Sequence, residues 1–553
     1  MSGAEFVFMP LGGCREIGMN LNAYGYGPPD NRRWIVVDVG VTFGNDTTPG
    51  VDLILPDPGY LETFAEDIEA IILTHAHEDH IGAIGWLWPR LRAPIYATPF
   101  TAYLVAEKLR ERGLEGEAEL NILQLRERRR FGPFDVELIT LTHSIPEPNG
   151  LAIRTPLGTV LHTGDWKIDP EPLIGEDFDQ AKVEQIGREG VLAMVCDSTN
   201  VFEEGEAGSE STAREALQKA VGEQSGRVAI TAFASNVARV QSACEAARAH
   251  DRSVCLLGRS MIRVTAAAQS VGLLRDFTFL EPEKAAQLPP RNVLYLCTGS
   301  QGEPNAALAR IARGDHPFVR FGSQDTVIFS SRVIPGNERS ISDIQNMLAE
   351  RGVKLVTDRQ FPIHVSGHPC RDELRRMYLW AKPRISIPVH GERRHVMEHA
   401  RFARSLQVPE SITPDNGDVI RLAPGPVEVI DQVPAGRLHV DGDVVTSDKA
   451  GGMWERRKMS ANGHLGVSLV VAGGRLEDGP VVVARGLSEP DGRPADESLD
   501  PIDEAAVAAL DGMKRSELED DERLEKILSR AVRRAAEQQF GKRPLVDITI
   551  HRI

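Results

Sequence analysis

The sequence lacks long apolar stretches and paired cysteines. No apolar run approaches the roughly 18 to 20 residues that span a bilayer, and residues 1–5 lack the basic and apolar regions of a signal peptide. The six cysteines are scattered, with no Cys-x-x-Cys pair, which argues against a disulfide framework or a zinc finger. We therefore expect a cytoplasmic protein with no membrane partner, whose cysteines are reduced and mostly buried.

An excess of positive charge is also missing. The formal net charge is −17, which is unfavourable for binding a polyanion. Residues 491–526 carry 13 acidic and 5 basic side chains, so a net −8 of this charge lies in one segment. The rest of the chain can still form a positive channel. The run Arg126-Glu127-Arg128-Arg129-Arg130 is one candidate for a contact with a nucleic-acid backbone, although such a run is more often a solvated face.

What the sequence does have is a dense group of metal-ligand residues. His75-Ala76-His77-Glu78-Asp79-His80 follows an apolar strand expected at 68–74. Imidazole and carboxylate together suit a borderline divalent ion such as zinc. So many ligands in one turn converge on a single four-coordinate ion only with strain, so the segment indicates two neighbouring ions. A lone His-x-His would more often be a strand end with surface histidines, but Asp79-His80 makes that reading less probable.

Three more ligand types stand at the ends of expected strands. His143 follows the apolar run 136–142, Asp165 follows the strand-like segment 159–162 and its turn, and His390 ends the run 385–389. Each alone is more often a core histidine or a turn aspartate. Four strand ends that all carry ligand types in one chain instead indicate a shared metal site.

These residues together resemble the five-motif metal site of the metallo-β-lactamase fold. Further segments narrow the resemblance to ribonuclease J, of the β-CASP branch of that superfamily. They are Asp197-Ser198-Thr199-Asn200, Phe233-Ala234-Ser235-Asn236, Gly258-Arg259-Ser260-Met261, Thr298-Gly299-Ser300-Gln301-Gly302-Glu303-Pro304, His364-Val365-Ser366-Gly367-His368 and Pro388-Val389-His390-Gly391-Glu392. The resemblance runs from Gly12 to the C-terminus, and it departs at Cys14-Arg15, where Leu-Gly is expected.

The ligand types predict that Asp165 bridges two divalent ions. We expect these ions to be zinc in preference to manganese. We expect His75, His77 and His143 to hold one ion and Asp79, His80 and His390 to hold the other. Two such ions about 3.5 to 4 Å apart lower the pKa of water toward 7 and stabilise charge on a phosphoryl oxygen. Asp79 is expected to orient the water as well, and His368 to protonate the departing 3′-oxygen.

The resemblance also implies two phosphate sites. The segment 364–368 is expected to hold the scissile phosphate, with His364 and Ser366 as donors and Gly367 allowing close backbone approach. The bland alternative for this segment is a capped turn. Ser235, Asn236, Arg259, Ser260, Ser300 and Glu303 are expected to line a pocket for a terminal 5′-monophosphate and the bases near it.

We expect an α/β protein whose metallo-β-lactamase αββα sandwich is split by an inserted β-CASP α/β domain. At 553 residues the chain is too long for one core. The predicted boundaries are 1–205 and 356–423 for the two parts of the metallo-β-lactamase domain and 206–355 for the insert. A linker at 424–450, rich in proline and glycine, then precedes a small α+β domain at 451–553. Insertion explains why His390 lies so far along the chain from Asp165.

The last domain is expected to run β-β-α-α-β, from strands at 465–472 and 480–487 to a terminal strand at 545–553. Ser516 to Glu519 matches a capping box, and the helix after it has an apolar stripe through Leu524, Leu528 and Val532. Such a stripe is more often core than interface. We nevertheless expect this domain to join subunits into a homodimer or homotetramer; a self-contained cap is the alternative.

The resemblance implies a metal-dependent ribonuclease that acts on single-stranded RNA, in RNA maturation (including rRNA processing) and mRNA decay. It would remove nucleotides 5′-to-3′ from monophosphorylated ends and also cut internally, with other RNA-decay proteins as further partners. Two alternatives stay open: a DNA nuclease of the same branch, since metal-assisted hydrolysis needs no 2′-hydroxyl, and a small-molecule metallo-hydrolase. A non-catalytic RNA-binding scaffold would lack ligands, and all seven are present.

Overall fold

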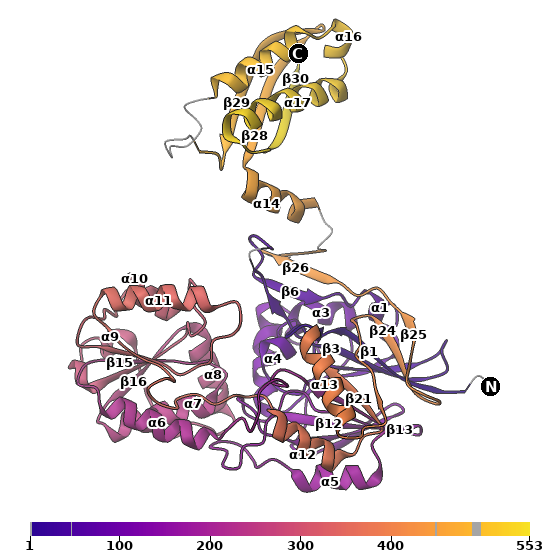
Figure 1. Ribbon diagram of the computed structural model, residues 1–553, viewed down its shortest axis with the longest axis vertical. Helices are drawn as coiled ribbons and strands as arrows, with labels where there is room; N and C mark the ends of the chain where they lie inside the picture. Colours follow the sequence, from indigo (N-terminus) through magenta and orange to yellow (C-terminus); the bar gives the residue numbers. More distant parts are fainter. Residues whose placement is uncertain (1–2, 46, 448–450, 489–498) are drawn as a thin grey trace. The chain divides into compact units, whose positions relative to one another are not determined.

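The computed structural model describes residues 3–45, 47–447, 451–488 and 499–553 (Figure 1). The chain forms two compact units, one from Met1–Thr42 and Leu55–Gly436, the other from Phe43–Ile54 and Arg437–Ile553. The short excursion at 43–54 therefore belongs with the C-terminal residues, which the sequence did not predict. None of the helices among the described residues is both long and apolar enough to span a membrane.

The first unit contains a sandwich of two sheets. An eight-stranded sheet has the order β25-β24-β1-β3-β4-β7-β8-β9. Its strands are β1 Glu5–Gly12, β3 Leu21–Gly27, β4 Arg33–Val37, β7 Ile68–Ile72, β8 Ile95–Ala97, β9 Leu120–Ile122, β24 Asp418–Ala423 and β25 Glu428–Gln432. The same part of the chain forms two short helices, α1 Gly59–Glu62 and α2 Glu78–Ile81, and two longer helices, α3 Ile84–Leu91 and α4 Pro99–Glu111. Several of these strands are buried over almost their whole length, as expected when a sheet is covered on both faces.

The second sheet of the sandwich has seven strands, in the order β10-β11-β12-β13-β14-β21-β23. They are β10 Arg128–Phe131, β11 Phe134–Thr140, β12 Asn149–Thr155, β13 Gly158–His162, β14 Ala193–Asp197, β21 Ile385–Val389 and β23 Glu410–Ser411. One apolar core lies between the sheets, joining side chains such as Phe8 and Ile35 to Val136 and Ile387. A second core packs this sheet against its outer helices, which are α5 Gln180–Glu189, α12 Arg371–Ala381 and α13 Arg393–Ser405.

The insert interrupts this second sheet between two neighbouring strands. β14 pairs in parallel with β21, although they lie almost 190 residues apart in the chain. Between them stands a six-stranded parallel sheet of order β17-β16-β18-β15-β19-β20, with α10 and α11 on one face and α6 and α7 on the other (Figure 1). Its strands are β15 Val228–Thr231, β16 Ser253–Leu257, β17 Phe279–Leu280, β18 Val293–Cys297, β19 Thr326–Phe329 and β20 Lys354–Val356. Its helices are α6 Glu210–Gly222, α7 Val237–Ala249, α8 Arg259–Ser270, α9 Pro282–Ala285, α10 Ala307–Arg313 and α11 Glu338–Glu350.

The second unit contains two small sheets. One has the order β27-β26-β6-β5, from β5 Thr42–Phe43, β6 Leu53–Pro56, β26 Arg437–Asp441 and β27 Val444–Ser447. The other has the order β29-β28-β30, from β28 His464–Ala472, β29 Arg475–Arg485 and β30 Leu545–Arg552. Its helices are α14 Gly451–Asn462, α15 Asp500–Asp511, α16 Arg515–Leu518 and α17 Asp521–Phe540. The expected strands are present, with β30 at an edge of their sheet, but α14 precedes them, and three helices rather than two lie between β29 and β30 in the described residues.

One local expectation for the last domain is wrong. The long helix begins at Asp521, and its cap is Asp520, whose side chain accepts from Arg523 N; Ser516 lies in the short helix α16 instead. The apolar stripe of α17 lies in the core, with Leu524, Leu528 and Val532 fully buried, as the more common reading of such a stripe predicts.

Two other segments are more ordered than the sequence indicates. Within the range 424–450, expected as a linker, β25 extends the eight-stranded sheet and β26 lies in the second unit, while residues 448–450 lie outside the described residues. The arginine-rich run is largely paired. Arg128 bonds Asp135, and Arg126 contacts Glu176 and Asp179, so this run is a solvated face rather than a free cationic surface.

Candidate metal centre

The seven expected metal ligands all stand just after strands of the sandwich. Residues 75–80 follow β7 of the first sheet, His143 follows β11, Asp165 follows β13 and His390 follows β21 directly. The last three strands belong to the second sheet. Loops from both sheets therefore meet at one edge of the sandwich, and they bring together residues more than 300 positions apart in the chain.

The first ligand group consists of three imidazoles and Asp165. His77 Nδ1 lies 3.1 Å from His75 Nε2 and 3.0 Å from His143 Nε2. Asp165 Oδ2 is 3.9 Å from His75 Nε2 and 3.8 Å from His143 Nε2. Nitrogens bound to one tetrahedral ion at about 2.0–2.1 Å lie roughly 3.3 Å apart. The spacing in this group matches one such ion.

The second group shares the same carboxylate oxygen. Asp165 Oδ2 is 3.3 Å from His80 Nε2 and 3.5 Å from His390 Nε2. Asp79 Oδ2 lies 3.6 Å from each of these nitrogens. Asp165 Oδ2 therefore belongs to both groups.

The outer nitrogens of these imidazoles face hydrogen-bonding partners. His75 Nδ1 is 3.0 Å from Thr74 Oγ1, and His80 Nδ1 is 2.8 Å from Asp38 Oδ2. His390 Nδ1 lies against the Asn20 amide, 3.0 Å from Nδ2 and 3.2 Å from Oδ1. The backbone oxygen of Gly367 accepts a hydrogen bond from His143 Nδ1, and Ser235 Oγ lies 3.0 Å from His77 Nε2. An outer nitrogen that donates its proton leaves the lone pair of the inner nitrogen for a metal. The residues present thus fit a metal centre.

Burial keeps the first group neutral. It lowers the pKa of His77 to about 4 and lowers the pKa of His75 and His143 well below the ordinary value. Neutral imidazole is the form that binds metal ions, because its lone pair is not protonated. At neutral pH, the three imidazoles of the first group are therefore ready donors.

His368 lies beside this centre and is held by an aspartate. Its Nδ1 donates to Asp197 Oδ2 at 2.8 Å, and Asp197 Oδ1 accepts from Thr199 N and Oγ1. Burial opposes a charged ring here, yet the carboxylates of Asp197 and Asp165 outweigh it and raise the pKa of His368 to about 9. Because Nδ1 is committed to Asp197, Nε2 is the atom left for a ligand.

The rest of the expected phosphate motif is placed by close packing. Ser366 Oγ accepts from Asn200 Nδ2 at 2.7 Å and from His368 N at 3.2 Å, so the hydroxyl proton remains to be donated. A Cβ added to Gly367 would lie 2.7 Å from Ser144 Oγ and 2.9 Å from a ring carbon of His143. The expected close approach at Gly367 is thus to a ligand histidine. Burial, and next Arg239, lower the pKa of the neighbouring His364 to about 3.

The residues expected to line the 5′-pocket gather at one edge of the insert sheet. Ser235 and Asn236 follow β15, Arg259 and Ser260 open α8 after β16, and Ser300 and Glu303 follow β18. Because these strands are parallel neighbours, their carboxyl ends lie at the same edge. This is also the edge that reaches the metal centre, since Ser235 contacts His77.

The side chains at that edge differ in their exposure and in their hydrogen bonds. Arg259 and Ser260 are exposed, whereas Ser300 is buried. Asn236 is committed inside the insert, because Oδ1 caps α7 at Arg239 N and Nδ2 donates to Glu210. The Glu303 carboxylate accepts from Gln301 N within its own loop. Two of the six residues therefore support the loops more directly than they face a ligand.

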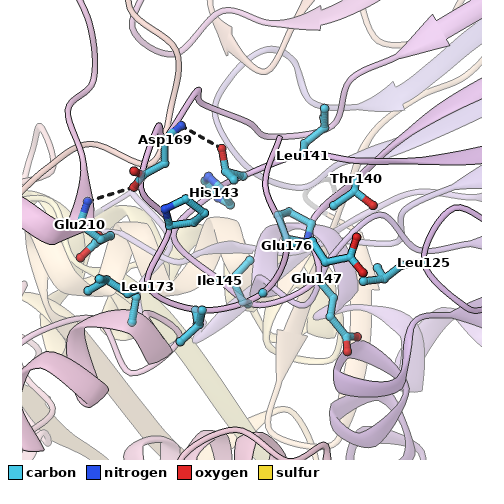
Figure 2. Close-up of a pocket in the computed structure, with 16 residues that line it drawn as sticks. Leu125, Thr140, Leu141, His143, Ile145, Glu147, Asp169, Leu173, Glu176 and Glu210 are labelled. Atoms are coloured by element: carbon cyan, nitrogen blue, oxygen red, sulfur yellow. Dashed lines mark hydrogen bonds between the residues drawn. The ribbon is translucent and has the colours of Figure 1, made fainter. Parts of the chain in front are cut away.

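A hollow beside His143 adjoins the metal centre (Figure 2). Its walls are mainly apolar, with Leu141, Ile145 and Leu173 among them, and Glu210 and Ala238 of the insert also line it. Figure 2 shows Asp169 bonded to the neighbouring residues at its rim, including Glu210 N at 2.9 Å. Several carboxylates line this hollow, so it is a poor place for a phosphate group.

Sequence reasoning missed residues that hold the ligands. Asp38 follows β4 and accepts from Thr74 N and His80 Nδ1, both at 2.8 Å. The rule that found the other ligands, a carboxylate at a strand end, could have found it. Asn20 lies beside His390, 370 positions away in the chain, and nothing in the local sequence signals that contact.

The departure at Cys14-Arg15 is accommodated by a short parallel pairing. β2 Cys14–Arg15 pairs with β22 Gly391–Glu392, next to His390, and His390 N donates to Gly13 O at 2.7 Å. Arg15 has a φ of 59°, a conformation that favours glycine. Its side chain forms an ion pair with Asp415, which compensates part of that strain.

Comparison with known families covers most of the chain. Residues 22–222 match the metallo-beta-lactamase superfamily, and residues 225–348 match the family described as "Ribonuclease J, beta-CASP domain". Residues 352–409 match "Zn-dependent metallo-hydrolase RNA specificity domain", and residues 452–553 match "Ribonuclease J C-terminal domain".

Similar proteins align over almost the full length. A protein named ribonuclease J from Sinorhizobium meliloti is 47% identical, over 99% of this chain and 98% of its own. Proteins of the same name from Corynebacterium glutamicum and Thermus thermophilus are 37% and 36% identical, over 98% and 97% of this chain and 75% and 94% of their own. A crystal structure of a protein of unknown function from Enterococcus faecalis aligns with a TM-score of 0.52 at 17% identity. That alignment covers 75% of this chain and 100% of that chain, and it supports the fold alone.

Proposed function

The chain belongs to the ribonuclease J family and is a metal-dependent ribonuclease, and we propose that it cleaves RNA with two divalent ions bridged by Asp165. The observation that carries this proposal is the sharing of one oxygen, Asp165 Oδ2, by two ligand groups that contain all seven expected ligands. Nitrogen-rich groups of this kind favour zinc, with manganese as the alternative. The ribonuclease reading holds over the DNA nuclease and small-molecule hydrolase alternatives.

Each ligand group has a role in this proposal. His75, His77 and His143 would hold the first ion, and Asp79, His80 and His390 would hold the second. Ions bound at these groups would lower the pKa of water toward 7 and stabilise charge on a phosphoryl oxygen. Asp79, the more exposed of the two carboxylate ligands, also orients the attacking water.

His368 is the proposed proton donor for the departing 3′-oxygen. Asp197 holds Nδ1, which leaves Nε2 to face the substrate, and the nearby carboxylates favour the protonated ring. A positioned acid of this kind typically contributes roughly 10²- to 10⁴-fold to the rate. Ser366, through its free hydroxyl proton, and neutral His364 would bind the non-bridging oxygens of the scissile phosphate.

The carboxyl edge of the insert sheet is the proposed site for the 5′-terminal phosphate. Arg259 supplies the positive charge, Ser260 and Ser300 supply hydroxyl groups, and α8 begins at this point after Gly258, which provides no side-chain cap. Asn236 and Glu303 would shape the loops. A pocket for a monophosphate favours 5′-to-3′ removal of nucleotides, while RNA that reaches the centre without using the pocket is cut internally. These activities suit RNA maturation and decay, alone or with other RNA-decay proteins.

One oligomer prepared in three forms tests this proposal. A single-stranded RNA with a 5′-monophosphate, the same RNA with a 5′-triphosphate, and its DNA version are each incubated with enzyme of measured metal content. Mononucleotides should be released fastest from the monophosphorylated RNA, and the DNA should be cut poorly. Equal release from both RNA ends would contradict the pocket, and equal cutting of DNA would contradict the selectivity for RNA.

The C-terminal sheet is the proposed assembly surface of a homodimer or homotetramer. β30 stands at its edge, where unpaired backbone groups can add a strand from another subunit. On β29, at the opposite edge of the same sheet, Val481 and Val483 are exposed to 60% and 42%. These valines, rather than the buried stripe of α17, would provide the apolar contact.

We also propose the domain boundaries expected above, with 206–355 as the insert and 451–553 as the assembly domain. A cytoplasmic location is proposed as well. All six cysteines are free and buried thiols, as expected in a reducing compartment.

A further inference from the structure

Ser235 of the insert contacts a ligand of the first ion. Its Oγ lies 3.0 Å from His77 Nε2, while His77 Nδ1 faces the nitrogens of His75 and His143. With Nδ1 turned toward the ion, the proton of neutral His77 must sit on Nε2. The contact is therefore a hydrogen bond from the ring to the serine hydroxyl oxygen.

This contact differs from those of the other four ligand imidazoles. Their outer nitrogens are held by Thr74, Asp38, Asn20 and the backbone of Gly367, all outside the insert. Only for His77, among the described ligands, does the holding group come from the insert. The first ion site is thus completed by two domains that fold around different cores.

The loop that carries Ser235 is rigidly built. Asn236 N donates to Phe233 O, and the Asn236 side chain caps α7 and bonds Glu210. Glu210 in turn forms a buried ion pair with Arg239, whose guanidinium also donates to the backbone oxygens of Ser330 and Ile363. The hydroxyl is therefore presented at a fixed place relative to the insert sheet.

We propose that Ser235 is a positioning residue through which the insert sets the affinity of the first metal site. The proposal rests on the ligand set of the proposed function. Outer partners of metal-bound histidines typically contribute roughly 10- to 100-fold to metal affinity. Because coupling between two equilibria is reciprocal, an ion at His77 also holds the insert loop in place. The hydroxyl then acts on the metal, whereas the family resemblance assigns this loop to RNA contact.

Zinc affinity separates the two roles of Ser235. The apoprotein is titrated with zinc against a chromophoric chelator, for the wild type and for Ser235→Ala, Ser235→Thr and Ser260→Ala. Ser235→Ala should weaken one of two zinc sites by roughly 10- to 100-fold. Ser235→Thr, which keeps the hydroxyl, should bind close to wild type. Ser260→Ala removes a serine of the same domain that does not contact His77, so its zinc affinity should not change.

Each outcome has a distinct meaning. Wild-type zinc affinity in Ser235→Ala, with weaker RNA binding, would overturn the proposal and leave Ser235 as an RNA-contact residue. If the wild type itself bound fewer than two zinc ions, the proposed ligand set would be wrong, whatever the role of Ser235. In Ser235→Ala the insert should stay in contact with the first domain, because Arg263 of α8 and Glu111 of α4 form a separate ion pair, 2.8 Å apart.

Hydrogen exchange gives a second measurement that needs no RNA. Zinc should slow amide exchange at residues 232–237 of the wild-type insert, because the ion immobilises His77 and His77 immobilises Ser235. In Ser235→Ala the same zinc addition should slow exchange around residues 75–80 and leave 232–237 unchanged. Equal protection of 232–237 in both proteins, or none in the wild type, would contradict the proposed link.

Discussion

The metal centre and the carboxyl edge of the insert sheet are both built from residues that follow strands, yet their side chains are held very differently. Every ligand imidazole at the centre has a partner on its outer nitrogen. Arg259 and Ser260 at the insert edge are exposed at the start of a helix. The centre is therefore organised before substrate arrives, whereas the edge offers charge and hydroxyl groups to a ligand. Substitutions at the centre should abolish cleavage, and those at the edge should tune it.

The largest loss of turnover is expected when a metal-ligand side chain is removed. Asp79→Ala or His77→Ala should lower turnover by about 10²- to 10³-fold or more, the range for removing one group from a preorganised site. Each variant should also lose or misplace one ion. Turnover and bound metal are measured on the same purified samples, with circular dichroism as the control for folding. Near-wild-type turnover in either variant would rule out the two-ion centre.

The next largest loss of turnover is expected at His368, and it separates the chemical step from metal binding. His368→Ala should slow the chemical step by roughly 10²- to 10⁴-fold, as for loss of a general acid, and leave metal content unchanged. Single-turnover cleavage of an RNA with sulfur in place of the departing 3′-oxygen should recover much of the loss, because a thiolate hardly needs a proton. Failure to recover would mean that His368 only positions the phosphate.

A smaller effect is expected at the insert edge. Arg259→Ala should raise KM for 5′-monophosphorylated RNA about 10-fold, since a hydrogen bond to a charged group is worth roughly 1.5 to 3 kcal/mol. Internal cutting of a circular RNA, which has no 5′ end, should stay unchanged and serves as the control. An equal loss on both substrates would show that Arg259 acts on the RNA backbone generally.

The smallest effect on catalysis is expected from the second unit, which contains none of the seven ligands. Truncation after about residue 450 should leave a monomer whose turnover on a short RNA stays within a few-fold of the full chain. Light scattering gives the mass of both proteins. An unchanged oligomer, or a full-length monomer, would reject the assembly role of this domain; Val481→Asp in the full chain provides a milder version of the same test.

The gathering of the candidate ligands was predictable from the sequence because they obey a local rule. Each stands where a buried strand ends, and packing of the strands collects such ends at one edge, so His143, Asp165 and His390 could be expected to meet. The same rule extends to Asp38, which was missed. The insert was predictable for a related reason, since its strands and helices alternate with clear periodicity.

Long-range pairing was not predictable in the same way. Residues 43–54 join the C-terminal unit through β5 and β6, and β24 pairs with β1 near the start of the chain. Such contacts depend on surfaces that form only when distant segments meet. At the start of α17, Ser516 and Asp520 are both residue types that cap helices, and it is Asp520 whose side chain accepts from Arg523 N.

The number of metal ions per chain tests the central claim most directly. Zinc is removed by chelation, the protein is titrated with zinc, and native mass spectrometry counts the bound ions while RNA cleavage is followed in parallel. Two ions should bind per chain, cleavage should return only with both, and Asp165→Asn should retain at most one ion and remain inactive. Full cleavage with a single bound ion, or in the zinc-free protein, would contradict a centre in which Asp165 bridges two metals.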